Sequence, residues 1–223
     1  MKHPRLTAPL QICSLTLRNR IVMPPMVTNM AQDDGLVTQA HLDHYRRSSG
    51  PGLVIVEAAA VLPEGRISRR QLGIYADRQV EGLARLAEII HSGGAAAGVQ
   101  VHHAGALAFQ ETGKQGFGQK FVRFLRLWNL QLMVSGLRRI REAFGSAARR
   151  AVDAGFDIIE LHAAHGYLFS QFFSPLKNRR IDRYGGSPDN RRRFLLEVFR
   201  TVCGQARQKA LVTCRLGVAD RRG

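Results

Sequence analysis

The chain alternates between short apolar runs and longer segments whose apolar residues recur every three or four positions. The runs are "RIVM", "GLVIVEAAAV", "AAAGVQV", "FDIIEL" and "ALVTCRLGV". The longer segments are "AHLDHYRRSS", "RQVEGLARLAEIIHSGG", "IREAFGSAARRAVDAG" and "NRRRFLLEVFRTVCGQA". Runs rich in Val and Ile are typical of buried strands, and the three–four spacing is typical of helices. Strands that alternate with helices of this length predict an α/β fold built on a parallel sheet.

Polar residues that can bind ligands or move protons gather near or beyond the C-terminal ends of these strands. The segment "HAAHGY", with His162, His165 and Tyr167, directly follows the run "AGFDIIEL". The other members of the group are Asn29, Gln100, His102, His103 and Arg215. In a β/α barrel this rim carries the active site, because the loops after the strands meet there. We therefore predict that these side chains share one pocket.

Two features of the histidines limit what the pocket can be. His102 and His103 are adjacent in a strand and point to opposite faces, so at most one of them can face the pocket. A histidine pair with a spacing of three can bind a metal ion on a helix. Here the pair follows a strand, and no acidic or cysteine partner has a suitable spacing. The sequence therefore predicts no metal site.

Composition narrows the class of protein. The chain has 223 residues, 45% of them hydrophobic, and no apolar run reaches the roughly 18 residues of a membrane span. The N-terminal residues lack the apolar core and cleavage site of a secretory signal. Three scattered cysteines, at positions 13, 203 and 214, indicate reduced thiols without a disulfide framework. We expect a cytoplasmic protein without a membrane partner.

The net charge of +16 raises the possibility of a polyanionic partner. The arginines cluster in "NRRIDRYGG", in "NRRRF" and at the end of the chain, where no aromatic residues are interleaved with them. No zinc-finger, helix-turn-helix or RNA-binding motif accompanies them. We expect no specific nucleic-acid partner, and a polyanion-binding protein remains a remote alternative.

A long motif carries a resemblance to a known family. The segment "AGFDIIELHAAHGYLFSQFFSPLKNRRIDRYGGSPDNRRRFLLEVF" contains H-x-x-H-G-Y-L, F-x-S-P-x-x-N-x-R and Y-G-G-S-x-x-N-R-x-R-F in order. Shorter matches are "LRNRIVMPPM" and "GLVIVEAAAVLPEGRIS". The chain resembles the old yellow enzyme family of FMN-dependent ene-reductases and NADH:flavin oxidoreductases, which includes the 2,4-dienoyl-CoA reductase type. The family fold is a (β/α)8 TIM barrel.

The resemblance implies an activity and roles for the "HAAHGY" residues. The expected reaction passes hydride from NADH or NADPH through FMN to an activated alkene of the enone or enoyl type, or to a related acceptor. His162 and His165 match the pair that hydrogen-bonds the substrate oxygen, and two donors there stabilise the negative charge that develops on it. Tyr167 matches the proton donor to the α-carbon. We also expect Asn29 to contact this small-molecule substrate.

The resemblance also implies a set of flavin contacts. Gln100 matches a residue that hydrogen-bonds the pyrimidine edge of the flavin. Arg215 matches the cation that stabilises negative charge near N1 of the reduced ring. Pro25, Met26 and Ala58 match positions packed against the isoalloxazine. A homo-oligomer is a candidate assembly of the full-length form of such a protein.

The sequence also departs from the family pattern. Val27 stands where many relatives carry a cysteine or threonine that tunes the flavin, and Ala106 stands where many carry an arginine. Residues 113–136 do not resemble the family and contain no acidic residue. A compensated reading-frame shift and a genuine basic insertion both explain this segment. We expect it to lie outside the sheet and to be poorly packed.

The number of strands is the second departure. Five strands can be identified, whereas a complete barrel needs eight and typically about 250 residues. We therefore expect residues 1–223 to form the N-terminal part of a single FMN-binding TIM-barrel domain. The loops that hold the cofactor phosphate follow strands seven and eight, so they fall beyond the five strands. An inactive truncated fragment or pseudogene product is the alternative to an active enzyme.

Overall fold

The computed structural model describes residues 3–48, 50–109 and 134–217. Its strands are β1 (Leu10–Ile12), β2 (Leu15–Leu17), β3 (Val22–Met23), β4 (Leu53–Ala60), β5 (Ala96–His102), β6 (Ile158–Ala163) and β7 (Leu211–Leu216). Its α-helices are α1 (Pro4–Thr7), α2 (Gln39–Arg46), α3 (Val80–Ser92), α5 (Val134–Asp153), α6 (Leu168–Phe173) and α7 (Pro188–Ala206). Short 3₁₀ turns are η1 (Pro63–Gly65), η2 (Asp77–Gln79) and η3 (Gly105–Leu107).

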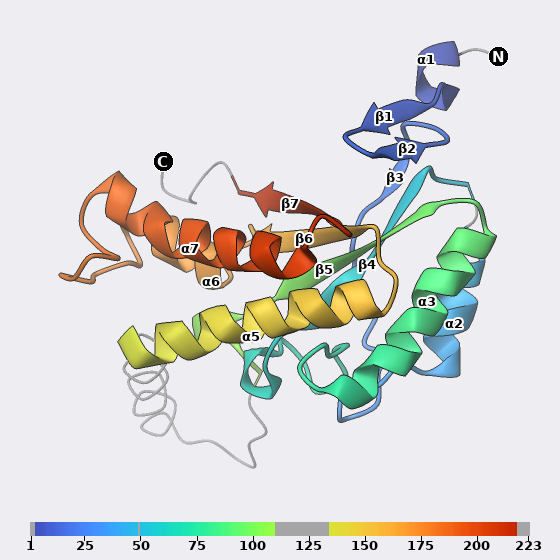
Figure 1. Cartoon of the computed structure of the whole chain (residues 1–223). Helices are drawn as coiled ribbons and strands as arrows, with labels where there is room; N and C mark the ends of the chain where they lie inside the picture. The colour runs from blue at the N-terminus through green and yellow to red at the C-terminus, as the bar shows by residue number, and fades with distance from the viewer. Residues whose placement is uncertain (1–2, 49, 110–133, 218–223) are drawn as a thin grey trace.

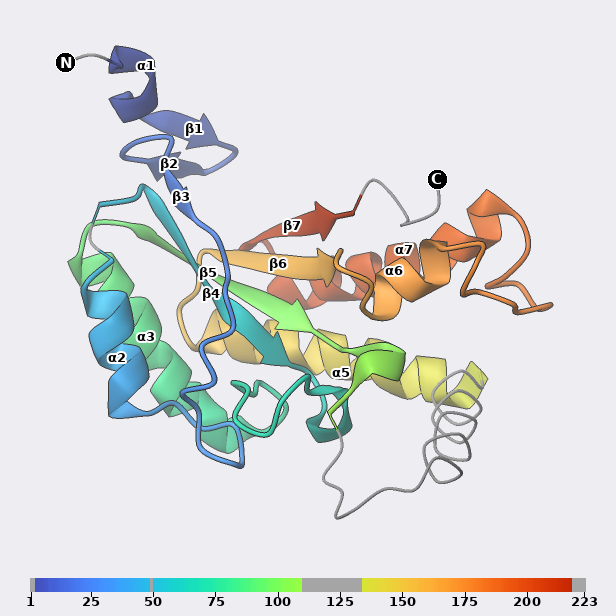
Figure 2. The same ribbon diagram turned by 180° about the vertical axis from the view of Figure 1, so that it is seen from behind.

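Five parallel strands form one sheet in the order β3-β4-β5-β6-β7. Figure 1 shows that the sheet curls and that α2, α3, α5 and α7 lie against its outer face. Figure 2, from the opposite side, shows the strands in front and these helices behind them. Each helix connects two neighbouring parallel strands, so the chain forms a half-barrel. The predicted order of strands and helices is confirmed.

Strand alternation separates the two faces of the sheet. In β6, Ile159 and Leu161 belong to the large core that the helices cover. Ile158 belongs to a different, inner cluster, and Glu160 and His162 point to the same inner face because side chains alternate along a strand. The β5 and β7 strands follow the same rule, since Gln100 pairs in register with Glu160.

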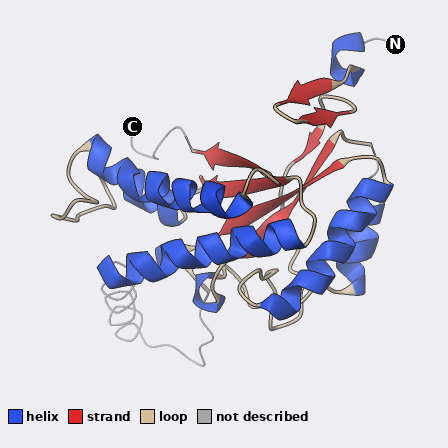
Figure 3. Ribbon diagram, in the orientation of Figure 1, coloured by secondary structure: helices blue, strands red, loops and turns tan. Residues whose placement is uncertain are grey.

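The inner face is closed at one end by the N-terminal hairpin. β1 and β2 pair antiparallel, and Leu17 of β2 is buried with Leu53, Ile55 and Ile158 of the sheet. Figure 3 places this hairpin beside the N-terminal ends of the sheet strands. No strand was predicted for these residues, because strands of three residues are too short to show a hydrophobic period. The short helices α1 and α6 were missed for the same reason.

A buried polar cluster fixes the edge of the sheet that β3 forms. The carboxylate of Glu57 accepts hydrogen bonds from the backbone N–H of Thr28, at 2.9 Å, and from Nε2 of His41, at 3.1 Å. The backbone N–H of Glu57 donates to the hydroxyl of Tyr45 at 2.9 Å. Glu57 and His41 are fully buried, so each needs these partners. The cluster ties the segment after β3 to both β4 and α2.

The prediction for residues 113–136 stays untested over most of its length. Residues 113–133 lie outside the described part of the chain, and residues 134–136 form the start of α5. The first residue of that helix, Val134, is 54% exposed, whereas Leu137 and Ile140 are buried in the core. The packed part of α5 therefore begins near Leu137.

Candidate functional site

The two histidines of "HAAHGY" meet at the C-terminal end of β6. His162 is the penultimate residue of the strand and is 5% exposed, so the strand extends further than the apolar run indicated. The chain then turns sharply through His165 and Gly166, whose φ angles are +59° and +77°. A positive φ is common for glycine and uncommon for histidine. This turn brings Nδ1 of His165 to 3.3 Å from Nε2 of His162.

The hydrogen bonds of the pair indicate where the protons lie. The backbone N–H of Ala164 donates to Nδ1 of His162 over a long 3.4 Å. The proton of a neutral His162 is therefore on Nε2, which donates to Nδ1 of His165. Burial, together with the nearby His165 and Arg215, lowers the pKa of His162 to about 4, so its ring is neutral at neutral pH. His165 is then left with Nε2–H as a donor toward a ligand.

Tyr167 begins the short helix α6 and faces the same rings. Its ring centroid lies 5.2 Å from that of His162 and 4.5 Å from that of His102, in edge-to-face geometry in both cases. The hydroxyl of Tyr167 forms no hydrogen bond within the described part of the chain, so its proton can be donated to a ligand. The structure therefore brings together all three predicted catalytic side chains.

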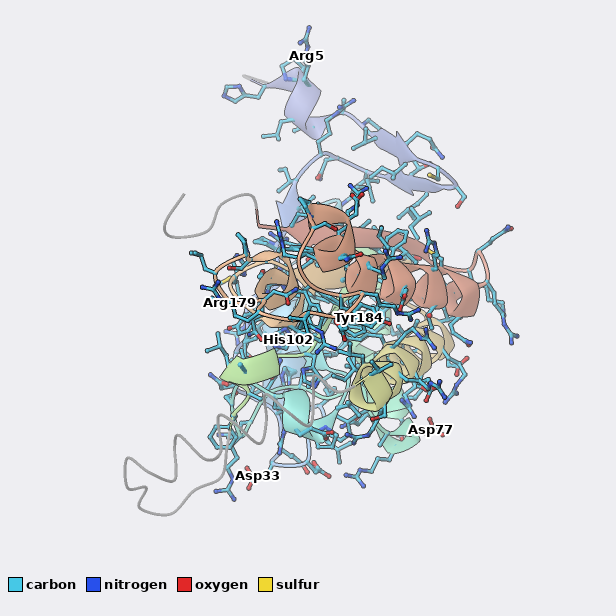
Figure 4. All side chains as sticks on the ribbon, turned by 90° about the vertical axis from the view of Figure 1, so that its left-hand side faces the viewer. Arg5, Asp33, Asp77, His102, Arg179 and Tyr184 are labelled. Atoms are coloured by element: carbon cyan, nitrogen blue, oxygen red, sulfur yellow. The ribbon has the colours of Figure 1, made fainter. Side chains whose placement is uncertain are left out.

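His102 is a fourth member of this group. It lies at the end of β5, is 0% exposed, and its ring centroid is 5.2 Å from that of His162. Neither of its ring nitrogens has a partner among the described residues. Burial, with smaller contributions from His162 and His103, lowers the pKa of His102 well below its ordinary value. Figure 4, from the side toward which the strand arrows point, shows His102 near the middle of this rim.

His103 faces away from the pocket, as strand alternation predicts. Its Nδ1 accepts a hydrogen bond from the backbone N–H of Gly105 at 3.0 Å. A Cβ atom on Gly65 would lie 2.6 Å from the ring of His103, so this glycine is needed for the ring to fit. His103 is a packed structural residue, and only His102 of the adjacent pair faces the site.

Three polar residues on the inner face of β5, β6 and β7 form a second group beside the histidines. Oε1 of Glu160 accepts hydrogen bonds from Nε2 of Gln100, at 2.7 Å, and from Nε of Arg215, at 2.9 Å. Gln100 is 2% exposed, whereas the Arg215 side chain is 33% exposed. The structure thus joins the two residues predicted for the flavin pyrimidine edge. Glu160 was missed, although its place two residues before His162 puts both side chains on one face.

The curled sheet and the convergent rim can now be compared with known proteins. Residues 5–223 match the sequence profile of the NADH:flavin oxidoreductase / NADH oxidase family. The chain belongs to this family. The resemblance and the incomplete barrel predicted from the sequence are therefore confirmed. FMN and a nicotinamide donor, predicted as cofactors, are those of the family.

Solved structures of family members superpose on the chain along most of its length. An old yellow enzyme from Pichia sp. AKU4542 has 30% sequence identity and a TM-score of 0.83, with 95% of this chain and 59% of that chain covered. Morphinone reductase in complex with tetrahydroNAD has 30% identity and a TM-score of 0.82, with 96% and 64% covered. The old yellow enzyme homologue from Zymomonas mobilis has 27% identity and a TM-score of 0.82, with 96% and 63% covered. The chain thus spans about three fifths of the length of these relatives.

The remaining residues predicted from the family pattern have different surroundings. Asn29 is exposed, has a φ of +58° and hydrogen-bonds Ser68. Met26 is 70% exposed, Pro25 is half-buried, and Ala58 is buried. No hydrogen bond or ring contact in the described part of the chain joins these four residues to the histidines. Their roles toward flavin and substrate remain predictions.

An exposed cation lies beside the turn that carries His165 and Gly166. Nζ of Lys177 lies 3.5 Å from the place that a Cβ atom on Gly166 would occupy. Lys177 and Arg179 are exposed, and neither forms an ion pair with a described carboxylate. Arg179 lies in the loop between α6 and α7, which extends beyond the ends of the strands (Figure 1). A negatively charged ligand would therefore be favoured beside this turn.

None of the described clusters of His, Cys, Asp and Glu has three members placed to hold a metal ion. Within the described part of the chain, every helix is too short or too polar to cross a membrane.

Proposed function

We propose that the chain provides the catalytic rim of an FMN-dependent reductase. The reaction oxidises NADH or NADPH and reduces the carbon–carbon double bond of an enone, an enoyl compound or a related acceptor. One hydride is added to the β-carbon and one proton to the α-carbon, so the alkene gains two electrons and two hydrogens. FMN, when bound, carries the hydride between the two substrates.

The inner-face residues fit the ring of this cofactor. Gln100 supplies hydrogen-bonding groups and Arg215 a cation for the pyrimidine end of the flavin, where charge develops on reduction. The hydroxyl of Thr213 lies on the same face, buried and without a partner among the described residues. The exposed Met26, with Pro25 and Ala58, offers apolar surface for a flat ring.

His162 and His165 bind the oxygen of the activating carbonyl. Both rings donate to it. For this, Nε2–H of His162 must exchange its partner, His165, for the ligand. Charge that grows on the oxygen is stabilised by these two donors, which are held by the strand end and the turn. Asn29 contacts the outer part of the substrate, and a small molecule is the partner that the site is built for.

Tyr167 supplies the proton. Its hydroxyl has no competing hydrogen bond within the described residues, and its ring is held edge-on by His102 and His162. A phenol keeps its proton at neutral pH and can release it to a developing carbanion. The convergence of His162, His165 and Tyr167 beside Gln100 and Arg215 is the observation that carries this proposal.

The test combines cofactor binding with two separate half-reactions. The purified chain is titrated with FMN, reduced anaerobically with NADH or NADPH, and then mixed with 2-cyclohexenone. We expect bleaching of the flavin absorbance by the nicotinamide and its recovery with the enone. A chain that binds no FMN would support the alternative of an inactive fragment. Bleaching of the flavin without recovery would exclude this alkene as the hydride acceptor.

Cellular placement and assembly belong to the same proposal. We place the enzyme in the cytoplasm, and its full-length form is a candidate homo-oligomer, to be measured by light scattering. The described residues show no feature that favours the polyanion alternative over a substrate site. Binding to DNA that depended steeply on salt and clearly on sequence would revive it.

A further inference from the structure

Glu160 lies between the two residues proposed to hold the flavin pyrimidine edge. A single oxygen of its carboxylate, Oε1, accepts from both Gln100 and Arg215, at 2.7 Å and 2.9 Å. The Glu160 side chain is 9% exposed. We propose that Glu160 is a positioning residue, whose carboxylate decides which atoms of Gln100 and Arg215 are presented to the flavin. This inference rests on the proposed function, because it assumes that the flavin ring lies at this face.

The carboxylate determines the orientation of the Gln100 amide. A carboxylate only accepts hydrogen bonds, so the NH₂ group of Gln100 must turn toward it. The opposite orientation would place two acceptor oxygens against each other in a buried site, which is costly. Oε1 of Gln100 is then the end left for a ligand. The site therefore offers an acceptor there, which suits an imide N–H such as the one in the flavin pyrimidine ring.

The same carboxylate holds the guanidinium of Arg215. Its Nε is bound to Glu160, and its two Nη groups have no partner within the described part of the chain. The planar guanidinium has five N–H donors in a fixed arrangement, so fixing Nε also fixes the direction of the rest. Arg215 is partly exposed, and without this contact its long side chain could turn toward water.

Packing alone does not explain a glutamate at this position. Ile158 lies two residues earlier on the same face of β6 and is part of an apolar cluster. An aliphatic residue at position 160 would extend that cluster, whereas a carboxylate with little exposure is costly unless partners satisfy it. The glutamate is therefore explained by the two donors that it binds, Gln100 and Arg215, as expected of a positioning residue.

The first experiment compares FMN affinities of the purified chain and its variants. Gln100→Ala and Arg215→Ala report the flavin site itself. Glu160→Gln should weaken FMN binding by about tenfold, because hydrogen bonds to a charged group are lost. Glu160→Asp keeps the charge with a shorter reach and should recover part of the affinity. Glu197→Gln is the matched control, since Glu197 on α7 accepts hydrogen bonds from Arg183 and Tyr184, and this variant should bind FMN like the wild type.

The midpoint potential of the bound flavin distinguishes two roles of Glu160: positioning Arg215, and acting on the flavin through its own negative charge. If Glu160 acted only through its charge, Glu160→Gln would leave Arg215 in place and raise the potential, because a nearby negative charge is removed. If Glu160 positions Arg215, the guanidinium also turns away, and the loss of its positive charge beside the ring offsets the loss of the carboxylate, so the potential does not rise. A raised potential with unchanged affinity would overturn the inference.

A measurement without flavin tests the hold on Gln100 directly. The side-chain amide protons of Gln100, assigned with Gln100→Ala, should exchange slowly in the wild type and quickly in Glu160→Gln. Weaker FMN binding in Gln100→Ala and Arg215→Ala, with Glu160→Gln unaffected, would overturn this inference alone. Unchanged FMN binding in all three variants, or a chain that binds no FMN, would overturn the proposed function. Slow exchange of the Gln100 amide protons in Glu160→Gln would, in either case, overturn the claim that Glu160 orients Gln100.

Discussion

The two halves of the inner face differ although the same strands build both. Near the strand starts the face is aliphatic, with Leu53, Ile55 and Ile158 buried beneath the hairpin. Near the strand ends it is polar, with histidines, Gln100, Glu160 and Arg215 around an open rim. The change occurs within two residues of one strand, between Ile158 and Glu160. The strand starts therefore contribute to stability, and the strand ends carry the proposed ligand contacts, as in β/α barrels generally.

Removing the Tyr167 hydroxyl is expected to have the largest effect on the polar half. Tyr167→Phe should slow alkene reduction by about 10²–10⁴-fold, the usual range for losing a general acid. Flavin reduction by the nicotinamide should remain nearly unchanged, since that step needs no proton from the tyrosine. Stopped-flow absorbance separates the two half-reactions. Equal losses in both would show that Tyr167 supports the fold or the flavin instead.

Shortening a side chain in the aliphatic half should instead affect stability more than FMN affinity. Ile158→Ala removes buried methyl groups and should lower the free energy of unfolding by about 2–5 kcal/mol. Urea unfolding measures it, with Leu216→Ala as the control because Leu216 is 58% exposed. If Ile158→Ala changed FMN affinity more than stability, the division between the two halves would be wrong.

The buried side chain of His162, in the polar half, should make the free energy of unfolding depend on pH. Burial lowers the pKa of His162 to about 4 in the folded chain, so below about pH 6.5 the unfolded state binds more protons than the folded state. Stability from this group is complete above about pH 6.5 and falls by up to about 3 kcal/mol as the pH drops to about 4.

The variant His162→Phe should flatten this dependence. Urea unfolding at pH 4.5, 5.5 and 7.5 measures the slope, and His3→Gln, near the exposed N-terminus, should leave it unchanged. His162→Ala should also weaken the binding of phenolic ligands that use the imidazole donors. A slope in His162→Phe equal to that of the wild type would assign the pH dependence to the other buried histidines.

A substitution at the boundary between the two halves should have the smallest effect on the free energy of unfolding. A Cβ atom on Gly98 would lie 3.3 Å from Cγ1 of Ile55 and 3.5 Å from Cβ of Ile158, which is tight but tolerable. Alanine is also less costly than glycine in a strand by about 0.5–1 kcal/mol. Gly98→Ala should therefore change the free energy of unfolding by less than about 1 kcal/mol. Gly52→Ala is the contrast, because its Cβ would lie 2.2 Å from a backbone oxygen, and it should unfold far more easily.

The sequence predicted the outer half of the architecture better than the inner half. Runs such as "GLVIVEAAAV" and the amphipathic helices follow regular periods, so their types and order could be predicted. Glu160 was missed because a single acidic residue in an apolar run gives no sign of its partners, which lie on β5 and β7. The orientation of His165 could not be predicted either, since it depends on a left-handed turn that histidine seldom adopts.

The hairpin that plugs the inner face also affects the order of folding. Leu17 and Ile158 are distant in the sequence but belong to one buried cluster, so this cluster cannot be complete on a ribosome until β6 has emerged. Contacts of such long sequence separation usually form late, after local strand–helix units have collapsed. Substitutions at Leu17 should therefore speed unfolding while leaving the folding rate nearly unchanged. The hairpin would then be among the last elements to pack, although it precedes the five-stranded sheet in the sequence.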